Sequence, residues 1–423
     1  MKRALVLSGG GAKGAYQLGV YKALKRLGIK INIITGTSIG AINGALLVSG
    51  DYRKAKKLWI STKTSNVLYH DISNPKEYAD ILKEYVTNKG LKFDKAEEYI
   101  GKIIKESKVR KSKTDYGLVT VNLKTRVPKM LSKDQIPNGK LISYISASAA
   151  CFPAVEKKEI DGEYYIDGGY YDNLPINLAI DMGADEIIAV DLSALGIKQK
   201  VKNKSIKIDY IKSNNKKRFS LNFSPMNSKK SISLGFNDTM KHFSMLDGNI
   251  YTFNKGDLER NYNKISSNYI NLIKLILLSD KKKFAAIDIL KNKRYQDMFL
   301  KIKQGKMLDV EINNALEYLA LLFGFDDDRI YSINLFNKML VREAKSLDYI
   351  TLDKKLKGKM LVGYIYNKYM NESDNEEAIK KLFNISLIFQ KDFMAALYLI
   401  AISSTKPIES CNFSDEILEK FKN

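Results

Sequence analysis

Short apolar runs alternate with amphipathic stretches in the first part of the chain. Residues 4–7 and 31–34 are apolar runs of strand length, and between them apolar side chains recur at helical spacing from Tyr16 to Leu27. Gly28 stands where that helix would end. A strand, a helix and a second strand in this order are typical of a parallel α/β sheet, whose functional sites lie at the carboxyl ends of the strands.

The same pattern continues to about residue 255. Asp161-Gly162, between two short strand-like runs, is a strong signal for a two-residue hairpin turn. We also expect strands at 116–122, 127–131, 186–191 and 249–253, helices at 141–150 and 176–182, and a further helix after the segment 233–240.

From residue 256 the character of the chain changes. Glycine becomes rarer and helical spacing dominates, as in Ile265, Tyr269 and Leu272. We therefore expect an α/β domain in residues 1–255 and an all-α domain of unknown role in residues 256–423. A chain of 423 residues is long enough for both.

Composition indicates the cellular compartment of the protein. The 45% hydrophobic fraction supports folded cores, and two cysteines, Cys151 and Cys411, are too few for a disulfide framework. The sequence shows neither the apolar region of a secretory leader nor an apolar run long enough to cross a bilayer. These features together predict a cytoplasmic protein.

The chain is strongly basic, with 70 Lys and Arg residues against 47 Asp and Glu and a formal net charge of +23. Part of this excess is local, because between residues 198 and 230 many lysines stand against a single acid, Asp209. A positive surface favours anionic partners, either an anionic membrane or nucleic acid. A lysine-rich surface that is merely solvated is the alternative.

One motif suggests chemistry. Gly36-Thr37-Ser38-Ile39-Gly40 lies between the apolar run 31–34 and a helix-like run of small and apolar residues at 41–48. G-x-S-x-G between a strand and a helix is the sequence form of a nucleophile elbow. Glycines on both sides permit a sharp turn that projects the serine hydroxyl, and the N-terminus of the next helix favours negative charge there. Since the motif also occurs by chance, the interpretation depends on the strand expected before it and the helix expected after it.

A glycine loop, Gly9-Gly10-Gly11-Ala12-Lys13-Gly14, follows the first expected strand. It matches G-x-G-x-x-G, but a dinucleotide site wants an acidic residue about twenty positions further on, and the chain has none before Asp51. A P-loop would need Lys-Ser or Lys-Thr at the last glycine, where Ala15 and Tyr16 follow instead. The remaining interpretation is a loop of backbone N–H groups beside a serine, which can bind an oxyanion.

A serine nucleophile needs a base, which is commonly a histidine. The chain has only His70 and His242, and neither lies in a recognisable motif. Asp167 ends the second strand of the expected hairpin and is followed by two glycines, so its carboxylate can approach a site with little steric hindrance. A carboxylate within hydrogen-bond reach can accept the serine proton directly. An ordinary Asp-Gly turn is the alternative.

Together the three motifs resemble the patatin-like phospholipase family in its bacterial form. The family signature is G-G-G-x-[K/R]-G, then G-x-S-x-G, then D-G-[A/G], and all three parts stand complete at residues 9–14, 36–40 and 167–169. The similarity covers about residues 1–255, with Ala150-Cys151 standing where a Pro-Gly pair is frequent. It implies a three-layer α/β fold with a mostly parallel central sheet, followed here by the all-α domain.

The resemblance also implies a serine acyl hydrolase that needs neither a metal nor a cofactor and acts on acyl esters of phospholipids or lysophospholipids. The implied roles are nucleophile for Ser38, general base for Asp167, and oxyanion or substrate binding for Gly9, Gly10, Gly11 and Lys13. Peripheral contact with an anionic membrane is then the expected partnership, rather than nucleic acid, and the oligomeric state is left open. Two alternatives remain, a non-catalytic scaffold that binds a partner or a membrane, and a non-lipid esterase or thioesterase with the same dyad.

Overall fold

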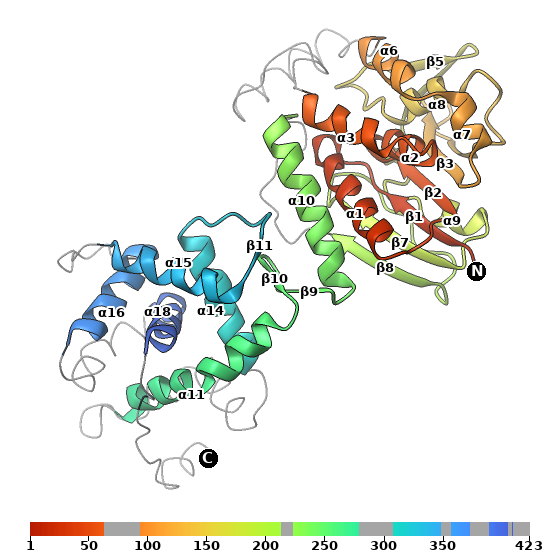
Figure 1. Ribbon diagram of the computed structural model, residues 1–423. Coiled ribbons are helices and arrows are strands. Elements are labelled where there is room, and N and C mark those ends of the chain that lie inside the picture. The colour runs from red at the N-terminus through yellow and green to blue at the C-terminus, as the bar shows by residue number, and fades with distance from the viewer. Residues whose placement is uncertain are drawn as a thin grey trace, which may run out of the picture. The chain divides into compact units, whose positions relative to one another are not determined.

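The computed structural model describes residues 1–62, 94–212, 223–278, 308–347, 357–372, 389–404 and 408. The chain divides into two compact units, Met1–Phe243 and Ser244–Asn423 (Figure 1). The domain boundary expected after residue 255 stays a prediction.

An eight-stranded sheet forms the centre of the first unit, in the order β5-β6-β3-β2-β1-β7-β8, with β4 also paired to β3. The five strands from β3 to β8 in this order run parallel, and β4, β5 and β6 add antiparallel pairs. The mostly parallel sheet expected from the sequence is therefore confirmed. Its strands are β1 (Arg3–Leu7), β2 (Ile33–Thr37), β3 (Asp115–Asn122), β4 (Pro128–Ser132), β5 (Lys158–Ile160), β6 (Glu163–Asp167), β7 (Glu186–Asp191) and β8 (Lys207–Lys212).

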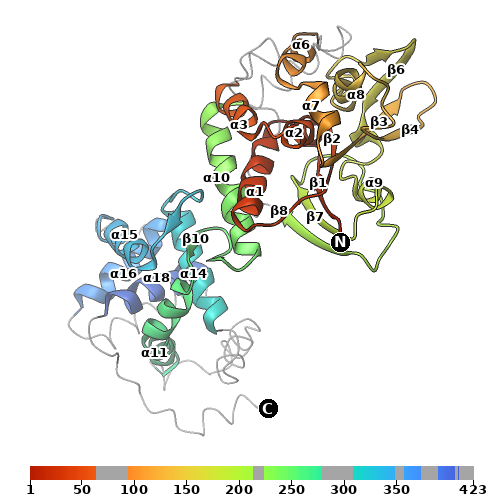
Figure 2. The same ribbon diagram turned by 45° about the vertical axis from the view of Figure 1, so that its right-hand side comes forward.

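Helices cover both faces of this sheet and complete three layers (Figure 2). Alternation along β1 sends Leu5 and Leu7 into the core of the larger helix layer, whereas Ala4 and Val6 pack on the opposite face beside Ala179 of α9 (Ile176–Asp181). The larger layer contains α1 (Ala15–Arg26), α2 (Ile39–Val48), α3 (Tyr52–Ser61), α6 (Asp94–Ile103), α7 (Glu106–Lys111), α8 (Leu141–Ser148) and α10 (Pro225–His242).

Two elements depart from the sequence-based expectation. The helix α10 begins at Pro225, where the Ser224 hydroxyl accepts the Asn227 N–H over 3.4 Å, so residues 233–240 lie inside the helix rather than before it. Gly235 lies inside this helix, and a Cβ at this position would lie 2.0 Å from the Tyr16 carbonyl oxygen of α1. The glycine is thus explained by close helix packing. In the basic tract, β8 forms where no strand was expected.

The second unit is helical and has its own core, in which Ile265, Tyr269 and Leu272 are buried as their spacing predicts. Its described helices are α11 (Asp257–Leu278), α14 (Leu308–Leu322), α15 (Ile333–Lys345), α16 (Lys359–Asn371) and α18 (Gln390–Ser403). A small sheet in the order β11-β10-β9 joins β9 (Leu246–Asp247), β10 (Thr252–Asn254) and β11 (Ile330–Tyr331). The helical C-terminal region is confirmed, with β11 as a short strand within it. No helix of the described ranges is long and apolar enough to cross a bilayer.

Candidate active site

Ser38 lies on a sharp turn between β2 and α2. Its backbone has φ 57° and ψ −124°, a conformation that residues other than glycine rarely adopt. The flanking glycines are required by packing, because a Cβ at Gly36 would lie 2.3 Å from the carbonyl oxygen of Gly40. A Cβ at Gly40 would lie 2.2 Å from the carbonyl oxygen of Leu7. The strand β2 therefore runs closely over the start of α2, and the serine is held at the junction.

Asp167 is the last residue of β6, and the fold brings it to Ser38. Its carboxylate accepts the Gly169 N–H over 2.7 Å, and the Ser38 side chain lies close enough to lower the pKa of that carboxyl. Gly168 allows the turn that follows, since a Cβ there would lie 2.2 Å from the carbonyl oxygen of Val119 in β3. The two residues that the sequence singled out as nucleophile and base are thus neighbours.

The environment of Asp167 shifts its titration. Burial raises the pKa of this carboxyl to about 6, while the nearby Ser38 side chain and the Gly169 N–H act in the opposite direction. The residue is only 5% exposed, so the loss of hydration is the dominant effect. A carboxylate with a pKa near neutrality is mostly ionised at pH 7 and still basic enough to take up a proton during a reaction.

The glycine loop between β1 and the 3-10 turn Gly11–Gly14 adjoins this pair. A Cβ at Gly9 would lie 3.2 Å from the Ser38 Cβ. The Gly9 N–H itself donates to the Asn173 carbonyl over 3.0 Å and is therefore occupied. Within the described residues, the N–H groups of Gly10 and Gly11 show no hydrogen-bond partner. These two groups are the donors that the loop can offer to a ligand.

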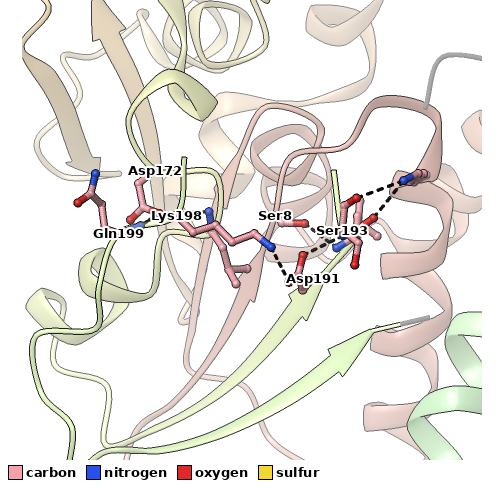
Figure 3. A network of polar contacts seen from close by, with 9 residues as sticks. Ser8, Asp172, Asp191, Ser193, Lys198 and Gln199 are labelled. Atoms are coloured by element: carbon pink, nitrogen blue, oxygen red, sulfur yellow. Dashed lines mark hydrogen bonds and ion pairs between the residues drawn. The ribbon is translucent and has the colours of Figure 1, made fainter. Parts of the chain in front are cut away.

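Lys13 contacts the start of the loop that follows β7. Its ammonium group donates to the carbonyl oxygens of Leu192, over 3.3 Å, and of Ser193, over 3.5 Å. The Leu192 N–H in turn donates to the Ser8 Oγ over 2.9 Å, and Figure 3 shows Ser8 beside this loop. In this structure Lys13 thus ties the glycine loop to the loop after β7.

Two further residues, which the sequence did not single out, belong to this neighbourhood. The Ser38 N–H donates to the Ser148 Oγ over 3.0 Å. Asn173 is 2% exposed and lies between two glycines, because its Oδ1 is 2.3 Å from a Cβ built on Gly9 and 3.1 Å from one built on Gly169. The only sequence signals for them were a small-residue helix before residue 152 and an Asn-Leu-Pro run after Asp167.

Of the two histidines and two cysteines, the structure describes His242 and Cys151. The His242 Nε2 lies 3.3 Å from the Asp209 Oδ1 at the end of α10, and His70 lies outside the described residues, as does Cys411. Burial, followed by the charge of Asp167, raises the pKa of the Cys151 thiol to about 11. This thiol is therefore protonated near neutrality. In the part of the chain that the structure describes, no three potential metal ligands gather.

Comparison with known proteins finds one family over the first part of the chain. Residues 5–180 match the family model "Patatin-like phospholipase". Patatin-like phospholipase domain-containing protein 7 of Rattus norvegicus is 32% identical over 202 residues, which are 45% of this chain and 14% of that protein. Lysophospholipase nte1 of Aspergillus terreus is 34% identical over 196 residues, which are 45% of this chain and 12% of that protein. The chain thus spans only a small share of the length of these curated relatives.

Among solved structures, VipD from Legionella pneumophila aligns with 98% of this chain and 93% of its own, at 13% identity and a TM-score of 0.32. The sequence match is the informative one, because residues 5–180 contain the glycine loop, Ser38 and Asp167. Residues 5–180 therefore resemble a patatin-like phospholipase domain.

Proposed function

We propose that the protein is a serine acyl hydrolase that cleaves acyl esters of phospholipids or lysophospholipids. The observation that carries this proposal is the proximity of the Ser38 side chain to the buried carboxylate of Asp167, whose pKa it lowers. The resemblance to a patatin-like phospholipase domain and a lysophospholipase among the relatives support a lipid acyl ester as the substrate.

In the first half-reaction Asp167 accepts the proton of the Ser38 hydroxyl while the oxygen attacks the ester carbonyl carbon. The N–H groups of Gly10 and Gly11 stabilise the oxyanion, and one preorganised donor of this kind is typically worth about 3 kcal/mol in the transition state. The tetrahedral intermediate then collapses, the alcohol or lysolipid leaves with the proton from Asp167, and the acyl group stays on Ser38.

In the second half-reaction Asp167 takes a proton from water, which attacks the acyl-serine. Collapse releases the fatty acid and returns the proton to Ser38. The occupied N–H of Gly9 excludes it as a donor in this scheme. Its role is to leave space between the glycine loop and Ser38, while Lys13 positions the loop after β7.

The deciding experiment compares wild type with Ser38→Ala on acyl esters, acyl thioesters and phospholipid vesicles. We expect the wild type to cleave the lipid esters and Ser38→Ala to lose turnover while keeping the circular dichroism spectrum of a folded protein. A preference for thioesters or short soluble esters would favour the non-lipid alternative. Absence of turnover together with failure of a fluorophosphonate to label Ser38 would contradict the hydrolase. Salt-sensitive binding of nucleic acid by such an inactive protein would favour the scaffold.

A further inference from the structure

The loop after β7 has an apolar tip that faces solvent. Leu195 is 100% exposed and Ile197 is 54% exposed, and both belong to residues 193–198, called here the Leu195 loop. A single exposed leucine is ordinary on a protein surface. Two large aliphatic side chains on one short loop form a local apolar patch, and such patches mark contact sites for proteins or membranes.

The Leu195 loop is held in place rather than collapsed onto the protein. The carboxylate of Asp191 accepts the Ser193 N–H over 2.8 Å and the Lys198 ammonium over 2.6 Å, so one side chain closes both ends of the loop. Figure 3 shows Asp191 between Ser193 and Lys198. Because the ends are fixed, Leu195 is presented to solvent by a defined backbone.

The loop is also attached to the candidate active site. The Ile197 N–H donates to the Gly169 carbonyl over 2.9 Å, and the Asn173 N–H donates to the Ile197 carbonyl over 2.6 Å. On the other side, a Cβ built on Gly10 would lie 3.4 Å from the Cβ of Ala194. The apolar tip therefore projects from a loop that touches both the glycine loop and the turn after Asp167.

Positive charge continues directly from the apolar tip. Lys198 and Lys202 pair with Asp191 and Asp181, over 2.6 and 3.4 Å. Lys200 and Lys204 are exposed, and neither forms an ion pair with any described residue. The basic residues at 216–218 lie outside the described ranges. An apolar tip followed by unpaired lysines matches the two attractions of an anionic lipid surface, which are apolar burial at the interface and cation binding to headgroups.

We propose that the Leu195 loop is a membrane-binding site that inserts into the interface of an anionic bilayer and places Ser38 beside the ester bonds of its lipids. The proposal rests on the proposed function for the identity of the surface, since a lipid hydrolase must reach substrate packed in a membrane. It assigns the expected membrane contact to the tip of this loop together with Lys200 and Lys204.

Binding is measured first, by sedimentation with phosphatidylcholine vesicles that contain or lack phosphatidylglycerol, using Ser38→Ala so that no substrate is consumed. Leu195→Ser should weaken binding to the anionic vesicles about tenfold, because transfer of a leucine side chain from water to an apolar phase is worth about that factor or more. Val127→Ser is the matched control, because Val127 is 57% exposed in the same unit but lies just before β4. Equal losses in both variants, or none in Leu195→Ser, would overturn the proposal.

Insertion itself is read from L195W. Trp59 is the only natural tryptophan and is 3% exposed, so a blue shift on adding anionic vesicles would report the new side chain. We expect this shift in L195W and none in V127W. The pair K200E/K204E should reduce the preference for anionic over neutral vesicles at least about 25-fold, since each lysine near such a surface contributes about fivefold. An unchanged preference would contradict the role of these lysines.

Activity then separates this proposal from the proposed function. These measurements use protein that keeps the wild-type Ser38. Here Leu195→Ser should lose turnover of vesicle lipid and keep turnover of a soluble monomeric ester. Equal turnover of vesicle lipid by wild type and Leu195→Ser would overturn the membrane site while leaving the hydrolase intact. If both proposals hold, Ser38→Ala alone should lose turnover of both vesicle lipid and soluble ester. This variant should still bind vesicles.

Discussion

The backbone N–H of Ser38 donates a hydrogen bond to the Oγ of Ser148 over 3.0 Å. Two residues further along the chain, the carbonyl of Ala150 accepts the N–H of Asp167 over 2.8 Å. The end of α8 and the residues after it therefore hold both the turn that carries Ser38 and the strand end that carries Asp167. The relative position of the two reacting groups depends on this short segment.

Removal of the Ser148 hydroxyl should impair catalysis without abolishing it. We expect Ser148→Ala to lower kcat on a soluble ester about fivefold with little change in KM, because one positioning hydrogen bond contributes about 1 kcal/mol. Ser146→Ala is the control, since the Ser146 Oγ is buried on the same helix and has no hydrogen-bond partner among the described residues. If steady-state kinetics show the same loss in both variants, the effect belongs to helix packing and not to the bond with Ser38.

The raised pKa of Asp167 predicts an acid limb in the pH profile. The base is active when ionised, so kcat/KM should fall as the pH drops through about 6. Asp167→Asn should remove turnover at every pH. Burial also raises the pKa of Asp172 to about 6, so this neighbour could produce the same limb. Asp172→Asn is therefore measured beside it, and disappearance of the limb in that variant would assign it to Asp172 instead.

The same shift predicts a gain in stability when the charge of Asp167 is removed. Its pKa rises from 3.8 in the unfolded chain to about 6 in the folded protein, so the wild type loses stability as the pH rises between these values. Above pH 6 Asp167→Asn should be more stable by up to about 3 kcal/mol, since one pKa unit corresponds to about 1.4 kcal/mol. Below pH 4 the difference should vanish. Denaturant unfolding followed by Trp59 fluorescence measures it, and a destabilised variant above pH 6 would contradict this account.

Close packing between α1 and α10 predicts that Gly19 tolerates no side chain. A Cβ there would lie 2.0 Å from the Ile232 carbonyl oxygen and 2.7 Å from the Phe236 nitrogen. Gly19→Ala should therefore destabilise the first unit by about 2–3 kcal/mol, as overpacking does. Gly101→Ala on α6 is the control, since its nearest neighbour would be the Ile142 Cγ2 at 3.8 Å, and a helical alanine there should be neutral or stabilising by about 0.5–1 kcal/mol. Equal unfolding free energies for the two variants would refute the packing argument.

Local features of this chain could be predicted from sequence because their causes are local. The turn Asp161-Gly162 has φ 53° and 80°, as a hairpin turn with two positive φ angles requires. The apolar run of β7 lies buried beside β1, as expected of a central parallel strand. Ser38 could be recognised because its turn constrains the residues on both sides of it.

Relations between distant residues needed the tertiary structure. The glycines at 19 and 235 look alike to any local rule, yet each is required because a backbone atom of another helix occupies the space of its side chain. Two hydrogen bonds join residues more than a hundred positions apart. The Ser38 N–H donates to the Ser148 Oγ, and the Gly9 N–H donates to the Asn173 carbonyl oxygen. Spacing and periodicity describe a residue's own neighbours in the chain, whereas these contacts arise only once strands and helices pack. The sequence around Ser38 and Asp167 was thus enough to recognise these reactive residues. Tertiary packing determined which residues hold them in position and which backbone N–H groups of the glycine loop remain available to a ligand.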